Sequence, residues 1–203
     1  MSQHKNIAGI ILAAGQSRRM ETGNKVLKLI DRQAMLLHVI DAANNAHLHP
    51  IIVVTGHEHE KVQHLLKNSA VDGVFNPDYR DGIASSIAHG IRQLGQTVDA
   101  AIILLGDMPH IKATHLNKLI NAYNPLTNTH ICVPYCQGQR GNPLLWGKKH
   151  FFELQQLQGD RGARVLLEKY RKQTSKVTIN DAAIFLDIDT PVDLENINQQ
   201  DIR

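Results

Sequence analysis

Short apolar runs alternate with longer amphipathic stretches along the whole chain. The apolar runs, many of them rich in β-branched residues, predict strands at 7–13, 51–55, 71–76, 100–105, 131–135, 142–146, 177–179 and 183–188. Apolar residues at helical spacing predict helices at 35–46, 61–67, 83–94, 114–123, 163–172 and 191–197, with Thr114 as an N-cap. This alternation favours an α/β fold with a mostly parallel sheet and helices on both faces.

The sequence contains no internal repeat, low-complexity segment or linker, so we expect a single domain over residues 1–203. The runs 51–55 (IIVVT) and 100–105 (AAIILL) are apolar throughout, as in strands covered on both faces. Ligands of open α/β sheets bind beyond the carboxyl ends of the strands. The segments that follow 7–13, 51–55 and 100–105 are therefore expected to carry the chemistry.

The first of these segments has the character of a phosphate-binding loop. An Ala-Ala-Gly turn at 13–15 lets a ligand approach the backbone closely, and Arg18, Arg19 and Lys25 add three cations. Seven residues separate Gly15 from Gly23, which excludes a P-loop, and a G-x-G-x-x-G fingerprint is also missing. One carboxylate hardly needs three cations, whereas a triphosphate does. The alternative is a basic surface loop exposed to solvent.

Aspartates follow two of the later apolar runs. Asp107 comes after a glycine at the end of 100–105, where a carboxylate can bind Mg²⁺ together with substrate phosphates. Asp187 and Asp189 alternate with Ile188, so we expect both on one side of a strand end. The Asp189-Thr190-Pro191 sequence is also a good helix start, so one of the two aspartates could serve only as a cap.

Composition narrows the class of protein. The 203 residues are 42% hydrophobic and 20% charged, and the formal net charge is +3 with a pI near 8.9, which indicates a soluble globular chain. The basic residues are spread along the chain, which argues against nucleic acid as a partner. No apolar run approaches a membrane span, and the N-terminal MSQHKN lacks the apolar stretch of a signal peptide. We expect a cytoplasmic protein with Cys132 and Cys136 as reduced thiols, at least one of them on a buried strand.

Three further features have two interpretations each. The histidines in GHEHEKVQHLL (56–66) do not form a His-Glu-x-x-His motif, and we interpret them as solvated rather than metal-binding. Trp146 fits core packing better than base stacking. Arg161 and Arg164 could be exposed arginines at a helix start or a clamp for a phosphate at that helix end.

Five segments in order along the chain carry a family resemblance. The motifs LAAGQSRRM…NK, LGDMP, RGNPLLW, GDRGAR and DIDTPVDL together resemble the molybdenum-cofactor nucleotidyltransferases. The alanine at position 14 and the segment DGIASSI (81–87) resemble the cytidylyl branch of that family rather than the guanylyl branch. The resemblance implies a Rossmann-like nucleotidyltransferase fold. It also implies transfer of CMP from CTP to molybdopterin-bound molybdenum, with release of pyrophosphate and dependence on Mg²⁺, or Mn²⁺ in its place.

The resemblance also implies roles for particular residues. The implied catalytic residues are Arg19, Lys25 and Asp107. The implied nucleotide-binding residues are Leu12, Ala13, Ala14, Gly15, Arg18, Arg19, Lys25, Ser85 and Ser86. The implied acceptor-binding residues are Gly141, Asn142, Pro143, Asp160, Arg161 and Arg164. The implied metal ligands are Asp107 with Asp187 or Asp189.

The expected partners are CTP, a molybdopterin-type cofactor and, transiently, a molybdoenzyme or an insertion chaperone, with no nucleic acid and no membrane. Three alternatives stay open at this point. The nucleotide could be GTP, or the acceptor could be a sugar or polyol phosphate. The chain could also be a non-catalytic nucleotide or cofactor carrier.

Overall fold

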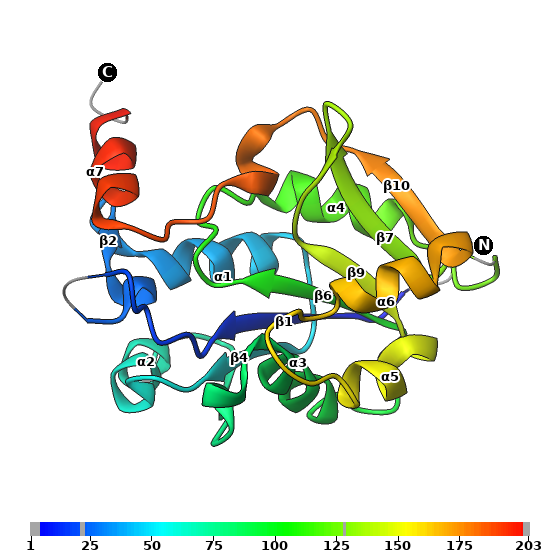
Figure 1. The fold of residues 1–203 in the computed structure, drawn as a ribbon, viewed down its shortest axis with the longest axis horizontal. Coiled ribbons are helices and arrows are strands. Elements are labelled where there is room, and N and C mark those ends of the chain that lie inside the picture. The colour runs from blue at the N-terminus through cyan, green and yellow to red at the C-terminus, as the bar shows by residue number, and fades with distance from the viewer. Residues whose placement is uncertain (1–4, 21–22, 128, 201–203) are drawn as a thin grey trace.

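The computed structural model describes residues 5–20, 23–127 and 129–200, which fold around one mixed β-sheet (Figure 1). The strands follow the order β10-β7-β9-β6-β1-β4-β5, and β8 pairs with β7. Their bounds are β1 Ile7–Ala13, β4 Ile51–Thr55, β5 Asp72–Phe75, β6 Ala100–Leu105, β7 Ile131–Cys136, β8 Gln139–Arg140, β9 Leu144–Gly147 and β10 Thr174–Thr178. A separate hairpin pairs β2 Leu29–Ile30 with β3 Gln33–Ala34. The α-helices are α1 Met35–Asn45, α2 His59–Leu66, α3 Ile83–Arg92, α4 Ala113–Ala122, α5 Phe151–Gln155, α6 Arg164–Lys169 and α7 Pro191–Gln200.

The central strands lie parallel and are buried on both faces. β1 pairs in parallel with β4 and β6, and all seven of its residues are buried. β9 runs antiparallel to both β6 and β7 and makes the sheet mixed. The strands predicted at 7–13, 51–55 and 100–105 coincide with β1, β4 and β6. The prediction of a mostly parallel α/β sheet with flanking helices is confirmed.

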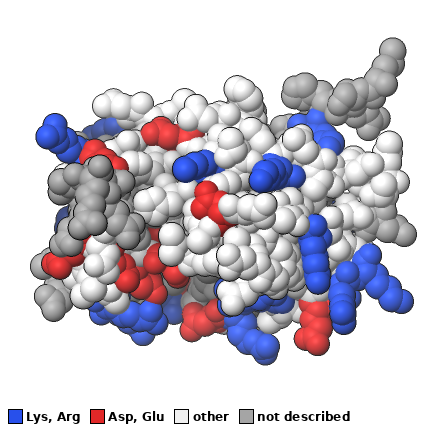
Figure 2. All heavy atoms as spheres, turned by 90° about the horizontal axis from the view of Figure 1, so that it is seen from above, with Lys and Arg blue, Asp and Glu red and all other residues white. Residues whose placement is uncertain are grey.

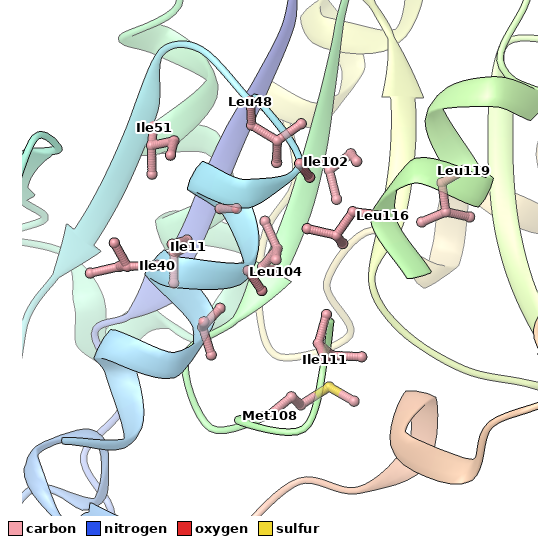
Figure 3. Packing of buried hydrophobic residues seen from close by; sticks show 14 of the residues in the cluster. Ile11, Ile40, Leu48, Ile51, Ile102, Leu104, Met108, Ile111, Leu116 and Leu119 are labelled. Carbon is pink, nitrogen blue, oxygen red and sulfur yellow. The ribbon is translucent and has the colours of Figure 1, made fainter. Parts of the chain in front are cut away.

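Two hydrophobic clusters cover the two faces of the sheet. Figure 3 shows the first, in which Ile40 of α1 and Leu116 of α4 pack with Ile11 and Leu104 of the sheet. The second joins α3, α5 and α6 to the opposite face and includes Trp146, which is fully buried. The interpretation of this tryptophan as a core residue is confirmed.

Several element predictions near the C-terminal half are wrong in detail. Residues 183–188 do not form a strand, because the Asp181 side chain accepts a hydrogen bond from Ala183 N–H at 2.9 Å and starts a 3-10 turn, Ala182–Phe185. Helix α4 begins at Ala113 rather than after Thr114, because the Nδ1 atom of His115 accepts from the Lys112 N–H at 3.2 Å and fixes the first turn earlier. The helix predicted at 163–172 divides into α6 and a 3-10 turn, Arg171–Gln173.

Cys132 and Cys136 are both buried on β7 and unbonded to each other, as the sequence predicts. Burial raises the pKa of Cys132 to about 12. None of the described helices combines the length and apolar character that a membrane crossing requires. Residues 1–4 of the N-terminal segment lie outside the described residues.

Charged side chains of both signs are spread over one face of the molecule. On the face seen in Figure 2, Lys and Arg side chains are separated by uncharged surface and by Asp and Glu. This distribution agrees with the small net charge of the sequence.

Candidate active site

The carboxyl ends of β1 and β6 open into a cleft of about 430 Å³. The Gly106 N–H donates to Leu12 O at 3.0 Å, so the turn that carries Asp107 is fixed against the end of β1. The cleft is lined by Leu12, Ala13, Ala14, Gly15, Gln16, Ser17, Arg18, Arg19, Lys25, Val26, Tyr79, Arg80, Gly82, Ile83, Ser86, Leu105, Asp107, Asp160 and Asp189. The structure therefore brings together most of the residues that the sequence predicts for nucleotide binding and catalysis.

Four charged side chains form an ion cluster in this cleft. The Lys25 Nζ lies 2.5 Å from Asp107 Oδ2 and 2.6 Å from Asp189 Oδ1. The Arg19 Nη1 lies 2.6 Å from Asp189 Oδ2. Lys25 and Asp189 are 164 positions apart in the sequence, so the fold itself assembles the cluster. We call Arg19, Lys25, Asp107 and Asp189 the ion cluster below.

Burial and opposite charge act against each other within the ion cluster. Burial alone would lower the pKa of Lys25, but the Asp107 and Asp189 carboxylates outweigh it and raise that pKa above its ordinary value. Burial raises the pKa of Asp107, and the adjacent Lys25 ammonium opposes the change. The Oδ1 atom of Asp107 is buried and has no hydrogen-bond partner among the described residues. A buried carboxylate oxygen without a partner is a site for a cation or a donor from a ligand.

Asp187 and Asp189 do not occupy equivalent positions. The strand expected there is absent, and Asp187 is exposed while Asp189 contacts Lys25 and Arg19. The helix cap is provided by Thr190 and Asp193, since Asp193 Oδ2 accepts from the Thr190 N–H at 2.8 Å and Thr190 Oγ1 accepts from the Asp193 N–H at 3.2 Å. The strand end expected at these aspartates is therefore wrong, although Asp187 still lies close enough to Asp107 for its charge to raise the pKa of Asp107. Asp189 is left to contribute its carboxylate to the ion cluster.

The residues predicted beside the ion cluster differ in their contacts. Arg18 is exposed, and its Nε donates to Gln16 Oε1 at 3.1 Å. Ser86 is buried and lines the cleft, and its Oγ accepts from the Asn76 amide at 3.1 Å. Ser85, in the first turn of α3, does not line the cleft, and its hydroxyl donates to Asp78 O at 2.8 Å and lies 2.9 Å from Gly82 O.

A second cavity of about 710 Å³ adjoins the first and shares Leu12, Ile83, Leu105 and Asp160 with it. Its polar lining is Arg140, Asn142, Asp160, Arg161, Arg164 and Glu168, over apolar residues that include Trp146. Of the predicted acceptor residues, Asn142, Asp160, Arg161 and Arg164 line this cavity. Gly141 and Pro143 are buried outside it.

The GDRGAR segment (159–164) contacts the segment DGIASSI directly. The Ala84 N–H donates to Gly159 O at 3.1 Å. Gly82 has a φ of +101°, and a Cβ placed there would lie 2.3 Å from Asp160 Oδ1. Only glycine fits this contact without a shift of the loop. The two segments therefore form the wall between the two cavities.

Several residues that line the cavities had no predicted role, and Tyr79, Arg80 and Arg140 are among them. Tyr79 and Arg80 line the first cavity and Arg140 lines the second. Arg80 directly precedes DGIASSI and Arg140 directly precedes the GNP motif (141–143), so proximity to a motif was the available signal. Asn24 and Glu58 support the phosphate loop from behind, and their contribution depends on tertiary contacts.

Solved protein structures with the same architecture identify its class. The protein has the α/β nucleotidyltransferase fold. The crystal structure of Rv0371c from Mycobacterium tuberculosis H37Rv superposes with a TM-score of 0.84 at 25% identity, covering 96% of this chain and 98% of that chain. A structure of Rv0371c in complex with manganese gives a TM-score of 0.81 at 24% identity, covering 96% and 99%.

The MobA-like NTP transferase domain matches residues 9–175, and the chain belongs to this family. Among curated proteins, the bifunctional protein GlmU of Syntrophomonas wolfei subsp. wolfei is 31% identical over 121 residues, which cover 58% of this chain. The match spans only 26% of that GlmU protein.

Proposed function

We propose that this protein is a nucleotidyltransferase that transfers CMP from CTP to the terminal phosphate of a molybdopterin-type cofactor and releases pyrophosphate. The observation that carries the transfer chemistry is the ion cluster inside the cleft at the carboxyl ends of β1 and β6. Two cations and two carboxylates that converge there suit a triphosphate and its metal better than a neutral ligand. Family membership over residues 9–175 supports the same reaction class.

The residues of the cleft account for the reaction as follows. An acceptor phosphate oxygen attacks the α-phosphorus of the nucleotide, a new P–O bond forms, and the bond from the α-phosphorus to the β-phosphate oxygen breaks. The leaving group is pyrophosphate. Because the attacking phosphate is already anionic, no general base is required. Lys25 and Arg19 hold the triphosphate and stabilise the negative charge that grows on the leaving group.

The residues present fit a divalent cation. Asp107 has a buried Oδ1 without a partner among the described residues, and Asp189 lies on the other side of the Lys25 ammonium. Asp107 and Asp189 would hold the ion once the triphosphate draws Lys25 away, with Asp187 as the further candidate. When bound, Mg²⁺ or Mn²⁺ supplies positive charge that stabilises the transferred phosphoryl group.

Two features support the choice of CTP and of an anionic acceptor. Ala14 and the segment 82–86 resemble the cytidylyl branch of the molybdenum-cofactor enzymes. The second cavity brings Arg140, Arg161 and Arg164 to its lining, and arginine matches the geometry of phosphate groups.

The test is nucleotide selection. CTP, GTP, ATP and UTP are each offered with molybdenum-loaded molybdopterin and Mg²⁺, pyrophosphate release is measured, and the products are separated. We expect the cytosine dinucleotide with CTP and much less product with the other three. Equal use of GTP contradicts the cytidylyl assignment. Nucleotide binding without pyrophosphate release would identify a carrier rather than an enzyme.

A second acceptor class, a sugar or polyol phosphate, is favoured by one specific observation. Asp160 and Glu168 line the second cavity, and carboxylates there would accept hydrogen bonds from the hydroxyl groups of a sugar. The same assay with hexose 1-phosphates and polyol phosphates in place of molybdopterin separates the two proposals.

A further inference from the structure

Hydrogen bonds connect the phosphate-binding loop after β1 to the loop after β4. Asn24 is only 2% exposed although it is polar. Its side-chain amide donates to His57 O at 2.9 Å, and its backbone N–H donates to Glu58 Oε2 at 2.9 Å. A buried polar residue with its donors satisfied by one neighbouring loop indicates a specific attachment between the two loops.

The attachment continues to the backbone of the catalytic lysine. The Ser17 Oγ accepts from the Lys25 N–H at 2.9 Å. The Asn24 side chain also accepts from the Val26 N–H at 3.3 Å and caps the 3-10 turn Lys25–Leu27. Lys25 is thus the first residue of a 3-10 turn that Asn24 caps. The backbone of Asn24 is itself hydrogen-bonded to Glu58.

The backbone of Glu58 is strained. Glu58 has φ +51° and ψ +36°, the left-handed region that non-glycine residues rarely adopt. Its carboxylate contacts two groups: Oε1 contacts the Lys61 ammonium and Oε2 accepts from Asn24. Strained backbone of this kind persists only where the surroundings require it and gathers at functional sites. Ser17, at the other end of the same network, has φ +51° as well.

We propose that Glu58 is a positioning residue for nucleotide binding: through Asn24 it fixes the turn that aims Lys25 into the cleft. Glu58 and Asn24 do not line the cleft, so they act on the nucleotide only through Lys25 and its loop. This inference rests on the proposed function, because it requires that the cleft binds a nucleoside triphosphate.

The test compares three variants with the wild type. Glu58→Ala removes the acceptor of the Asn24 N–H. Glu58→Gln keeps an amide oxygen that can accept the same bond. Glu60→Gln is the matched control, because Glu60 is an exposed acid on the first turn of α2. Calorimetric titration with CTP, GTP, ATP and UTP in the presence of Mg²⁺ gives the dissociation constants, and amide hydrogen exchange follows the peptide that contains residues 17–27.

We expect Glu58→Ala to weaken binding of the preferred nucleotide about tenfold, the order of one hydrogen bond to a charged group. Exchange in the 17–27 peptide should become faster in this variant alone. The dissociation constants of Glu58→Gln and Glu60→Gln should stay within about threefold of the wild type. Glu58→Gln is expected to do so because its amide oxygen accepts the hydrogen bond in place of the carboxylate. Wild-type affinity in Glu58→Ala, with or without a lower melting temperature, overturns the inference.

Failure of the proposed function gives a different result, because the wild type itself then binds none of the four nucleotides. If Glu58→Ala does not fold, Glu58→Gly replaces it. Glycine adopts the φ of +51° without strain and likewise removes the acceptor of the Asn24 N–H. This variant should also lose affinity several-fold, and unchanged affinity again overturns the inference.

Discussion

At the scale of single residues, Asp107 has the most demanding position in the ion cluster. Its side chain is largely buried, one oxygen is paired with Lys25, and the other has no partner among the described residues. Asp107→Asn keeps the shape but removes the charge, so we expect kcat for pyrophosphate release to fall at least about 100-fold, as when an electrostatic group that stabilises the transition state is removed. Asp41→Asn on α1 is the control for an exposed aspartate. Turnover of Asp107→Asn within a few-fold of the wild type would remove Asp107 from the site.

The two neighbouring arginines are predicted to differ. Both side chains are exposed, but Arg19 contacts Asp189 in the ion cluster, whereas Arg18 bonds only to Gln16 among the contacts that the structure describes. We expect Arg19→Ala to lower kcat/KM about 10- to 100-fold, as the loss of one phosphate contact in the transition state would. Arg18→Ala should lower kcat/KM much less. Steady-state kinetics with the preferred nucleotide measures both, and a larger loss in Arg18→Ala would reverse the assignment of the phosphate contact.

The sequence indicated Lys25 and Asp107 because both follow buried apolar runs at one edge of the sheet. The direct pairing of Lys25 with two aspartates could not be predicted, since it depends on side-chain conformations and since Asp189 lies 164 positions from Lys25. Asn24 and Glu58 were also missed. Their roles depend on left-handed backbone at Glu58, and a glutamate gives no sequence signal for it.

At the scale of elements, the segment between β10 and α7 decides how Asp189 reaches the cleft. The apolar run 183–188 predicted a strand with Asp187 and Asp189 on one side of its end, but the segment has no strand partner and is held by other contacts. The Ile188 N–H donates to Asp107 O at 3.0 Å, and the Ile188 side chain is fully buried with Ile30 and Met35. The alternation at 187–189 therefore reflects one buried apolar residue, Ile188, between two polar residues.

Ile188 therefore links stability to the site. We expect Ile188→Ala to lower the free energy of unfolding by about 2–4 kcal/mol through the cavity that it leaves. Affinity for the nucleotide should fall as well, because Asp189 loses its anchor. Denaturant unfolding and calorimetric titration measure the two effects. Leu186→Ala, at a site that is 48% exposed, is the matched control and should change neither. Stability of Ile188→Ala within about 0.5 kcal/mol of the wild type would contradict the packing role.

At the scale of the whole molecule, the mixed sheet separates two tasks. The parallel strands β1 and β6 present the ion cluster at their carboxyl ends, and the antiparallel β9 contributes Leu144 and Trp146 to the second cavity. The parallel core could be predicted from apolar runs alone. The antiparallel direction of β9 could not be predicted, because the apolar pattern of a short buried strand does not depend on the direction of the strand.

The fold also buries three histidines that do not line the cleft. His130 and His150 are each 2% exposed and His115 is 4% exposed. Burial lowers the pKa of all three below the ordinary value, although Asp181 opposes the change at His115 and Glu153 does so at His150. The folded protein therefore keeps these rings neutral at pH values where the unfolded chain already binds protons.

The sign of the resulting pH dependence follows from this difference. Below about pH 6.5, the ordinary pKa of histidine, the unfolded state takes up protons that the native state does not, so stability falls as the pH falls. Each such histidine contributes at most about 1.4 kcal/mol per pH unit. We expect the free energy of unfolding, measured by urea denaturation between pH 7.5 and 5.5, to decrease steadily with acidification.

His150→Phe isolates one of these contributions. The His150 ring packs against Tyr170 at a centroid distance of 4.5 Å and against Trp146 at 5.9 Å, so a phenyl ring preserves the packing. The one ion-pair contact given for His150 joins its Nδ1 to Glu153 Oε2 at 3.7 Å, longer than a hydrogen bond, so the substitution removes only this contact. We expect this variant to be at least as stable as the wild type at pH 7.5 and to lose less stability on acidification. His64→Gln, an exposed site on α2, is the control and should keep the wild-type slope. An unchanged slope in His150→Phe would mean that His150 is protonated to the same extent in the folded and unfolded states.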